Sequence, residues 1–173
     1  MKRVNFLKRA LWLAVVAVAT VMNVSAQEKG DMAAGANLVF GSGNSLSNIG
    51  VGAKFQYNVT DPLRLEGAFN YFLKKNYVTM WDFSVNGHWL FPVGDKLTVY
   101  PLAGLGILNS GSSVNIGYGL GKVSASSSYF AINLGGGLDY KLTDKLTGNV
   151  ELKYKIADLW DRLLLSAGVN YKF

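Results

Sequence analysis

The last eleven residues of the chain alternate between an apolar set and a mostly polar set. The apolar set is Leu163, Leu165, Ala167, Val169, Tyr171 and Phe173, and the set between them is Leu164, Ser166, Gly168, Asn170 and Lys172. A period of two residues indicates a β-strand whose two faces meet different surroundings. The segment is therefore predicted to be a strand with one apolar face, and the final residue of the chain belongs to that face.

Seven further segments repeat this pattern, and stretches rich in Gly, Asn, Asp and Pro separate them. Each segment is about ten residues long, which is the length of a tilted strand that crosses a membrane. We therefore predict an all-β fold, an eight-stranded antiparallel up-and-down transmembrane β-barrel. The predicted strands are residues 32–41, 49–59, 63–71, 77–91, 97–107, 130–142, 146–156 and 162–173.

The connections between the predicted strands alternate in length. The second, fourth and sixth are short and similar, with Val-Thr-Asp at 59–61, Val-Gly-Asp at 93–95 and Leu-Thr-Asp at 142–144. The others vary, and residues 109–128, rich in Ser and Gly, are predicted to form the longest irregular loop. Short turns on one side and longer loops on the other are typical of outer-membrane barrels. Both termini are therefore expected on the short-turn side, in the periplasm.

Residues 1–26 have the features of a cleaved secretory signal peptide. Basic residues at the start are followed by an apolar run over residues 10–22 and by Val24-Ser25-Ala26, which places small residues at the −3 and −1 positions of a cleavage site. The alternative, a transmembrane helix, requires about 20 apolar residues, more than this run provides. The remaining residues, 27–173, are predicted to form one outer-membrane β-barrel domain.

Charge and composition argue against several classes of function. Four of the 17 Lys and Arg residues lie in the predicted leader, which leaves 13 basic against 11 acidic residues in the mature domain. This small excess does not indicate a nucleic-acid partner, because such partners bind a clustered basic surface. The chain contains no Cys, so disulfide and thiolate chemistry are excluded.

Alternation alone leaves open which face of the barrel is apolar. A soluble ligand-binding barrel would turn the apolar set inward, whereas a membrane barrel turns it toward lipid. Charges within the strands fall on the polar face, and a charge on a lipid face costs about 2–4 kcal/mol at mid-depth. Aromatic residues also gather at the strand ends, as membrane interfaces select, so we predict a lipid-facing apolar set. They are Tyr57, Trp89, Phe91, Tyr140, Tyr171 and Phe173 near the short turns, and Phe40, Tyr71, Tyr77, Trp81, Tyr129 and Trp160 near the loops.

The terminal Tyr171-Lys172-Phe173 resembles the carboxyl-terminal signal of bacterial outer-membrane β-barrel proteins. Residues 32–173 as a whole resemble the eight-stranded families of this class, the OmpA membrane domain and the OmpX- and OmpW-like porin family. The resemblance implies the outer membrane of a Gram-negative bacterium, contact with outer-membrane lipid and with the barrel-insertion machinery, and an assembly signal at Tyr171 and Phe173. These families include adhesins, small-solute channels, lipid enzymes and anchors, so the resemblance leaves the function open.

The polar face is predicted to form a network of opposite charges inside the barrel. Eight strands leave an interior just wide enough for side chains to fill, and a lone buried charge is expensive, so neighbouring opposite charges should pair. We expect these groups to plug the lumen, and the alternative is a narrow path for ions or small solutes. The predicted network is Lys54, Arg64, Glu66, Asp82, His88, Asp139, Lys141, Glu151 and Lys153, with Lys155 and Lys172 on the same face.

No catalytic, cofactor or metal site is predicted. His88 is the only His, and no Cys is present to complete a metal site with it. An enzyme acting on lipid would need a nucleophile and a base among the loops, which offer serines and Asp158 but no His. The sequence therefore predicts a structural or surface-interaction role, through extracellular loops that meet an extracellular ligand or surface partner. A narrow channel is the alternative.

Overall fold

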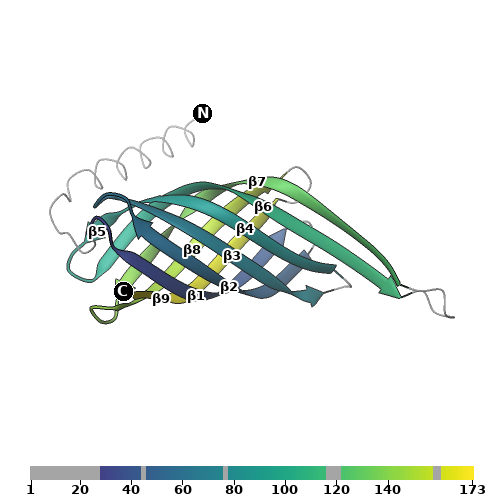
Figure 1. The fold of residues 1–173 in the computed structure, drawn as a ribbon, viewed down its shortest axis with the longest axis horizontal. Coiled ribbons are helices and arrows are strands. Elements are labelled where there is room, and N and C mark those ends of the chain that lie inside the picture. Colours follow the sequence, from purple (N-terminus) through teal and green to yellow (C-terminus); the bar gives the residue numbers. More distant parts are fainter. Residues whose placement is uncertain (1–27, 44–45, 76–77, 116–121, 158–160) are drawn as a thin grey trace, which may run out of the picture.

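Nine β-strand segments form one closed antiparallel sheet in the computed structural model, which describes residues 28–43, 46–75, 78–115, 122–157 and 161–173 (Figure 1). The predicted signal peptide, Tyr77, Asp158 and Trp160 lie outside the described residues. Among the residues described, no helix is long and apolar enough to cross a membrane. The segments are β1 (Met32–Gly43), β2 (Leu46–Asn58), β3 (Leu63–Lys75), β4 (Val78–Trp89), β5 (Phe91–Val93), β6 (Leu97–Asn115), β7 (Lys122–Lys141), β8 (Leu146–Ala157) and β9 (Arg162–Lys172).

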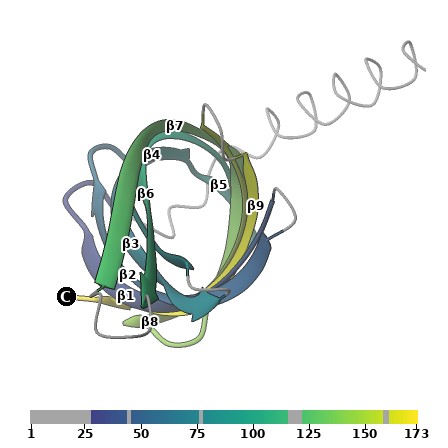
Figure 2. The ribbon, with the colours of Figure 1, turned by 90° about the vertical axis from the view of Figure 1, so that its right-hand side faces the viewer.

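The barrel closes because its first and last strands pair. β1 and β9 are antiparallel from Ala33↔Lys172 to Ser42↔Leu163. β4 and β5 both pair with β6 and are separated only by Leu90, so together they make one of the eight strands of the wall. An open edge in lipid would leave amide groups unpaired at several kcal/mol each. The predicted eight-stranded up-and-down barrel is confirmed, and Figure 2 shows the ring from one end.

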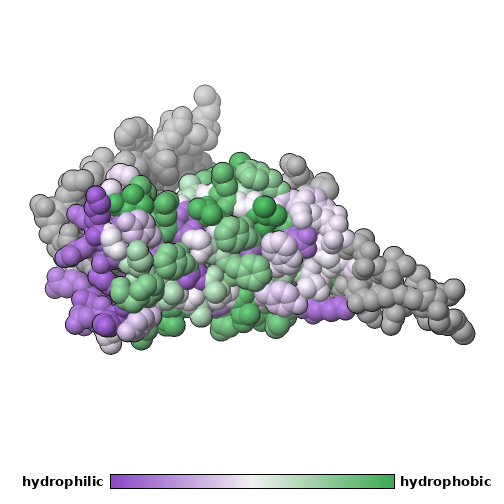
Figure 3. All heavy atoms as spheres, in the orientation of Figure 1, coloured by the Kyte–Doolittle hydropathy of each residue, from purple (hydrophilic) through white to green (hydrophobic). Residues whose placement is uncertain are grey.

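Side chains alternate between the outer surface and the interior of the barrel. On β8, Val150 and Leu152 are 40% and 50% exposed, whereas Glu151 between them is 1% exposed. The same pattern on the other strands produces a hydrophobic band around the middle of the barrel, next to a hydrophilic end that carries the short turns (Figure 3). The apolar set faces outward, as predicted, and this excludes a soluble barrel with an apolar ligand cavity.

Threonine side chains close two of the short turns. The hydroxyl of Thr60 accepts a hydrogen bond from the backbone N–H of Leu63 at 3.2 Å, and the hydroxyl of Thr143 accepts one from Leu146 at 3.0 Å. In the third short turn Gly94 has a φ of 77°, a conformation that other residues rarely adopt. The short sequence motifs that these three connections share therefore form tight turns.

The prediction of an irregular loop over residues 109–128 is wrong for most of these residues. β6 continues to Asn115 and β7 begins at Lys122, so the two strands form a long hairpin. Ser and Gly dominate residues 109–113 and 124–128, so no apolar alternation marks these parts of the sequence, and backbone pairing defines the strands there. The hairpin extends beyond its neighbours on the loop side, since among the described residues β7 pairs with β8 from Ala131 onward (Figure 1).

Candidate functional site: the charge network inside the barrel

Four cationic and four anionic side chains are buried in the middle of the barrel, and each residue is at most 5% exposed. They come from β2, β3, β4, β7 and β8, at positions that the alternation of each strand turns inward. A buried charge is expensive unless it is paired, so the distances between these groups decide what they do. The cations are Lys54, Arg64, Lys153 and Lys155, and the anions are Glu66, Asp82, Asp139 and Glu151.

Glu151 lies at the centre of this network. Its Oε1 is 3.0 Å from Lys54 Nζ, and its Oε2 is 2.9 Å from Lys153 Nζ. The hydroxyl of Tyr100 donates a further hydrogen bond to Oε1 at 2.9 Å. Two ammonium groups and one hydroxyl therefore surround this carboxylate.

Glu66 lies farther from the same two lysines. Its carboxylate oxygens are 3.6 Å from Lys54 Nζ and 3.8 Å from Lys153 Nζ. Its closer partners are neutral, because the side-chain amides of Gln56 and Asn86 donate to it at 2.8 Å and 3.2 Å. Glu66 is thus held mainly by amides and shares its cations with Glu151.

Arg64 connects another carboxylate to His88. Its Nη1 donates to Asp139 Oδ2 at 2.6 Å, and its Nε donates to His88 Nδ1 at 3.2 Å. Because Nδ1 accepts this bond, the proton of a neutral imidazole is on Nε2, which faces Glu66 Oε1 at 3.7 Å. The ring of Tyr100 stacks on the imidazole, with centroids 4.7 Å apart, and the Arg64 guanidinium lies over the same ring.

Asp82 and Lys155 form a third pair, nearer the loops. Lys155 Nζ lies 3.2 Å from Asp82 Oδ1, and the amide of Asn70 donates to the same oxygen at 3.0 Å. Asn70 in turn accepts a hydrogen bond from Asn37 at 3.2 Å. Each of the four buried carboxylates therefore lies within 3.8 Å of a cationic side chain.

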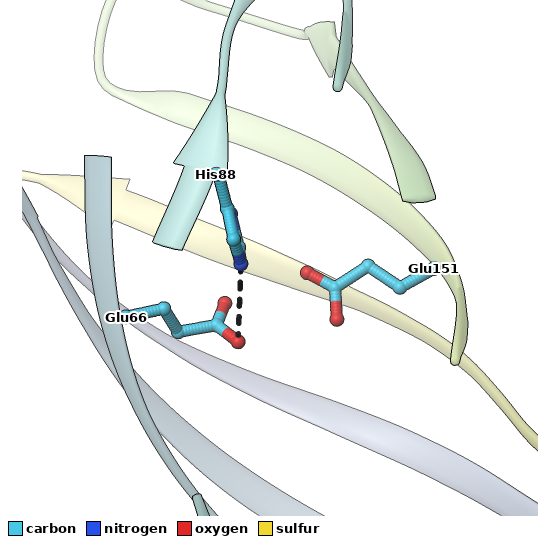
Figure 4. Close-up of side chains that lie close together, drawn as sticks. All are labelled: Glu66, His88 and Glu151. Carbon is cyan, nitrogen blue, oxygen red and sulfur yellow. Dashed lines mark ion pairs between the residues drawn. The ribbon is translucent and has the colours of Figure 1, made fainter. Parts of the chain in front are cut away.

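Glu66, His88 and Glu151 bring three potential metal-ligand atoms within 4.8 Å of one another (Figure 4). Carboxylate and imidazole groups at such separations hold metal ions in other proteins. Here, however, the ammonium groups of Lys54 and Lys153 lie 2.9–3.8 Å from the two carboxylates. A divalent cation among them would meet two like charges, so the geometry favours an ion-pair network over a metal centre.

Lys141, the ninth residue of the predicted network, lies at the rim on the turn side. Its side chain is 42% exposed and pairs with Asp144 at 2.9 Å, and the hydrogen bond from Lys141 lowers the pKa of that carboxyl. Lys141 lines a cavity of about 90 Å³, and Asp31, Lys96 and Lys172 line the same cavity. Its place at the last position of β7, beside the turn, explains why it contacts solvent.

The network predicted from the sequence omits Tyr100, although the alternation of residues in β6 indicates an inward side chain at this position. Its neighbours Val99 and Pro101 belong to the outward set, so alternation turns Tyr100 inward, but a phenol does not stand out on a polar face as a charge does. The proposed assembly residues Tyr171 and Phe173 face outward on the turn side of the barrel. The centroid of the Phe173 ring lies 6.3 Å from the centroid of the Phe55 ring.

The role of Tyr171 and Phe173 as an assembly signal stays a prediction.

A family model described as the outer membrane protein beta-barrel domain matches residues 11–173 of the chain. The chain belongs to this family. Membership indicates a protein that resides in lipid, in the outer membrane of a Gram-negative bacterium. No curated protein matches the chain.

Solved outer-membrane barrels have the same fold at low sequence identity. The N-terminal β-barrel domain of OprF from Pseudomonas aeruginosa is 19% identical, with a TM-score of 0.64, and the match covers 85% of this chain and 100% of that one. Neisserial surface protein A is 17% identical, with a TM-score of 0.62 and coverages of 83% and 96%. Ail of Yersinia pestis is 16% identical, with a TM-score of 0.56 and coverages of 84% and 99%. At these identities the likeness establishes the fold alone.

Proposed function

We propose that this protein is an outer-membrane barrel with a plugged polar lumen, which has a structural role and presents its loop side as an interaction surface. It carries out no enzymatic reaction. The observation that supports the plug best is the contact between Lys54 of β2 and Glu151 of β8, 3.0 Å apart across the lumen from strands that β1 and β9 separate. Side chains that meet across the lumen leave little room for a solute.

A narrow channel is the second candidate, and the polar cavity on the turn side favours it. That cavity contacts Arg64 and Asp139. From there a permeating ion would have to pass the Arg64–Asp139 pair and then the lysines around Glu151, whose side chains are at most 7% exposed. The charged groups along this route are buried and paired with opposite charges, which supports the plug over the channel. Planar-bilayer recording of the unmodified protein separates the two.

The loop side is the proposed outer surface, with the termini and short turns in the periplasm. The hairpin of β6 and β7 supports this orientation, because long extracellular loops and short periplasmic turns are the rule in such barrels. Within the described chain, the β7 backbone before Ala131 has no partner in β8. An unpaired edge of this kind can pair with an extended strand of a surface partner.

Protease treatment of intact cells tests this orientation. Trypsin added outside should cleave the hairpin at Lys122, which begins β7, and should spare an epitope inserted at the start of the mature chain, which leaves the terminal Phe173 in place. The same treatment after the outer membrane is made permeable should remove the epitope. Removal of the epitope in intact cells, with the hairpin uncut, would reverse the orientation.

The interaction role is tested by shortening the hairpin. Residues 110–127 are replaced by Asn-Gly, which forms a two-residue hairpin turn. The barrel should still fold, as reported by heat-modifiable migration on gels, and cells that carry it should lose attachment to host-cell monolayers. Undiminished attachment would contradict a role for the hairpin.

A further inference from the structure

Four apolar side chains meet inside the barrel, at interior positions where the sequence pattern predicts a polar lumen. They form one cluster, and none is more than 2% exposed. On the facing wall, Leu108, Ala131 and Ala157 are also buried, with exposures of 0–5%. The four clustered side chains are Val39 of β1, Phe72 of β3, Met80 of β4 and Leu164 of β9.

This apolar cluster lies on the loop side of the charge network. On β4, Met80 is one interior position nearer the loops than Asp82, and on β3, Phe72 is one interior position beyond Asn70. On the β3 and β4 side of the barrel, a path from the loops therefore passes Phe72 and Met80 before it reaches Asp82.

Arg162, the fifth buried cation, lies on this apolar cluster. Its guanidinium is 4.6 Å from the centroid of the Phe72 ring, and it donates to Met80 Sδ at 3.2 Å and to Asn48 Oδ1. β1 has Gly41 at this point, and a Cβ there would collide with the guanidinium. In the described part of the chain these partners of Arg162 are all neutral, and Asp82 of the charge network is the carboxylate that acts on it at longer range.

We propose that the apolar cluster and Arg162 form a seal that acts independently of the charge network and closes the lumen toward the loops. An apolar constriction in a pore excludes water, because entering water would lose its hydrogen bonds. The Arg162 guanidinium, which forms no ion pair among the described residues, adds electrostatic repulsion against cations. The lumen then communicates with solvent only toward the turns, where the polar cavity lies. This inference deepens the proposed plug and rests on it.

A variant that breaks the charge network tests whether the seal is independent. In Glu151→Ala/Lys153→Ala a carboxylate and an ammonium leave together, so the buried charge stays balanced. The folded variant, identified by heat-modifiable migration, should show no steady conductance in planar bilayers. Steady conductance of this variant alone would overturn the seal, whereas conductance of the unmodified protein would overturn the proposed plug.

A cysteine reporter tests the seal without recording current. The chain has no Cys, so Ser84→Cys places a single thiol inside the barrel, two interior positions from Met80 on β4. A positively charged, membrane-impermeant methanethiosulfonate is added to vesicles on the side where protease cleaves the hairpin. We expect slow modification, and about tenfold faster modification once Met80→Ser makes the constriction polar.

The matched control is Leu102→Ser, which alters a buried lumenal Leu in the second apolar cluster, with Leu90 and Tyr100, toward the turns. It should leave the rate from the loop side unchanged. Equal rates with and without Met80→Ser, or fast modification while the seal is intact, would overturn the inference.

Discussion

Lys54 and Glu151 face each other across the barrel, with Nζ and Oε1 3.0 Å apart, although β1 and β9 separate their strands in the sheet. The contact joins residues 97 positions apart in the chain and links the wall near the amino terminus to the wall near the carboxyl terminus. Glu151 is also the nearest carboxylate to both Lys54 and Lys153. Removal of the Glu151 carboxylate should therefore lower the stability of the whole barrel.

Glu151→Ala is expected to destabilise the barrel more than Glu66→Ala. Removing Glu151 leaves two buried ammonium groups without their nearest carboxylate, which costs about 3–5 kcal/mol, less if water enters the gap. Glu66 is bound mainly by amides, so its removal should cost less. The free energy of unfolding in urea, measured in lipid vesicles, checks the order, with the exposed Asp144→Asn as a control that should change nothing. Equal losses for the two glutamates would contradict the network as described.

Val150→Arg should prevent folding into lipid vesicles. Val150 is 40% exposed on the outer face of β8, and an Arg on the lipid face costs about 2–4 kcal/mol near the midplane. Thr147→Arg on the same strand is the matched control, because Thr147 lines the polar cavity on the turn side. Asn149 would be a poor control, since its side chain accepts a hydrogen bond from Lys54 at 2.9 Å. If Val150→Arg folds as readily as Thr147→Arg, the lipid-facing assignment fails.

Deleting Phe173 should lower the amount of protein in the outer membrane and leave aggregates in the periplasm. Recognition of the terminal aromatic residue by the insertion machinery is the predicted cause. Phe55→Ala separates recognition from packing, because it removes the ring that Phe173 contacts and keeps the terminus intact. Quantification of both variants in membrane fractions checks this. If the two variants lose the same amount, packing rather than a signal explains the effect.

The strands were predictable because lipid on one side and a polar interior on the other impose a period of two on the sequence. The pairing of charges was not. Asp82 pairs with Lys155, and Lys54 pairs with Glu151. Which side chains meet across the lumen depends on the tilt and stagger of all eight strands. A pattern along one strand carries no information about this stagger.

The apolar cluster was also missed, for a different reason. Met80 and its interior neighbour Val78 are the only apolar residues on the inward face of β4 before Asp82, too short a run to predict an apolar layer. Met80 is paired with Phe72 on the adjacent strand β3, and the packing of both with Val39 of β1 and Leu164 of β9 identifies the layer. The extended hairpin escaped prediction because Ser and Gly dominate residues 109–113 and 124–128, where β6 and β7 continue without an apolar period.

Planar-bilayer recording of the unmodified, folded protein tests the proposed closure of the lumen most directly. Buried pairs such as Arg64–Asp139, 2.6 Å apart, and the apolar cluster beyond them predict no steady conductance at any salt concentration. Glu66→Lys should likewise fail to produce a well-behaved ion channel. Steady, salt-dependent conductance of the unmodified protein, with an ion selectivity that reverses in Glu66→Lys, would contradict the plug and establish the channel in its place.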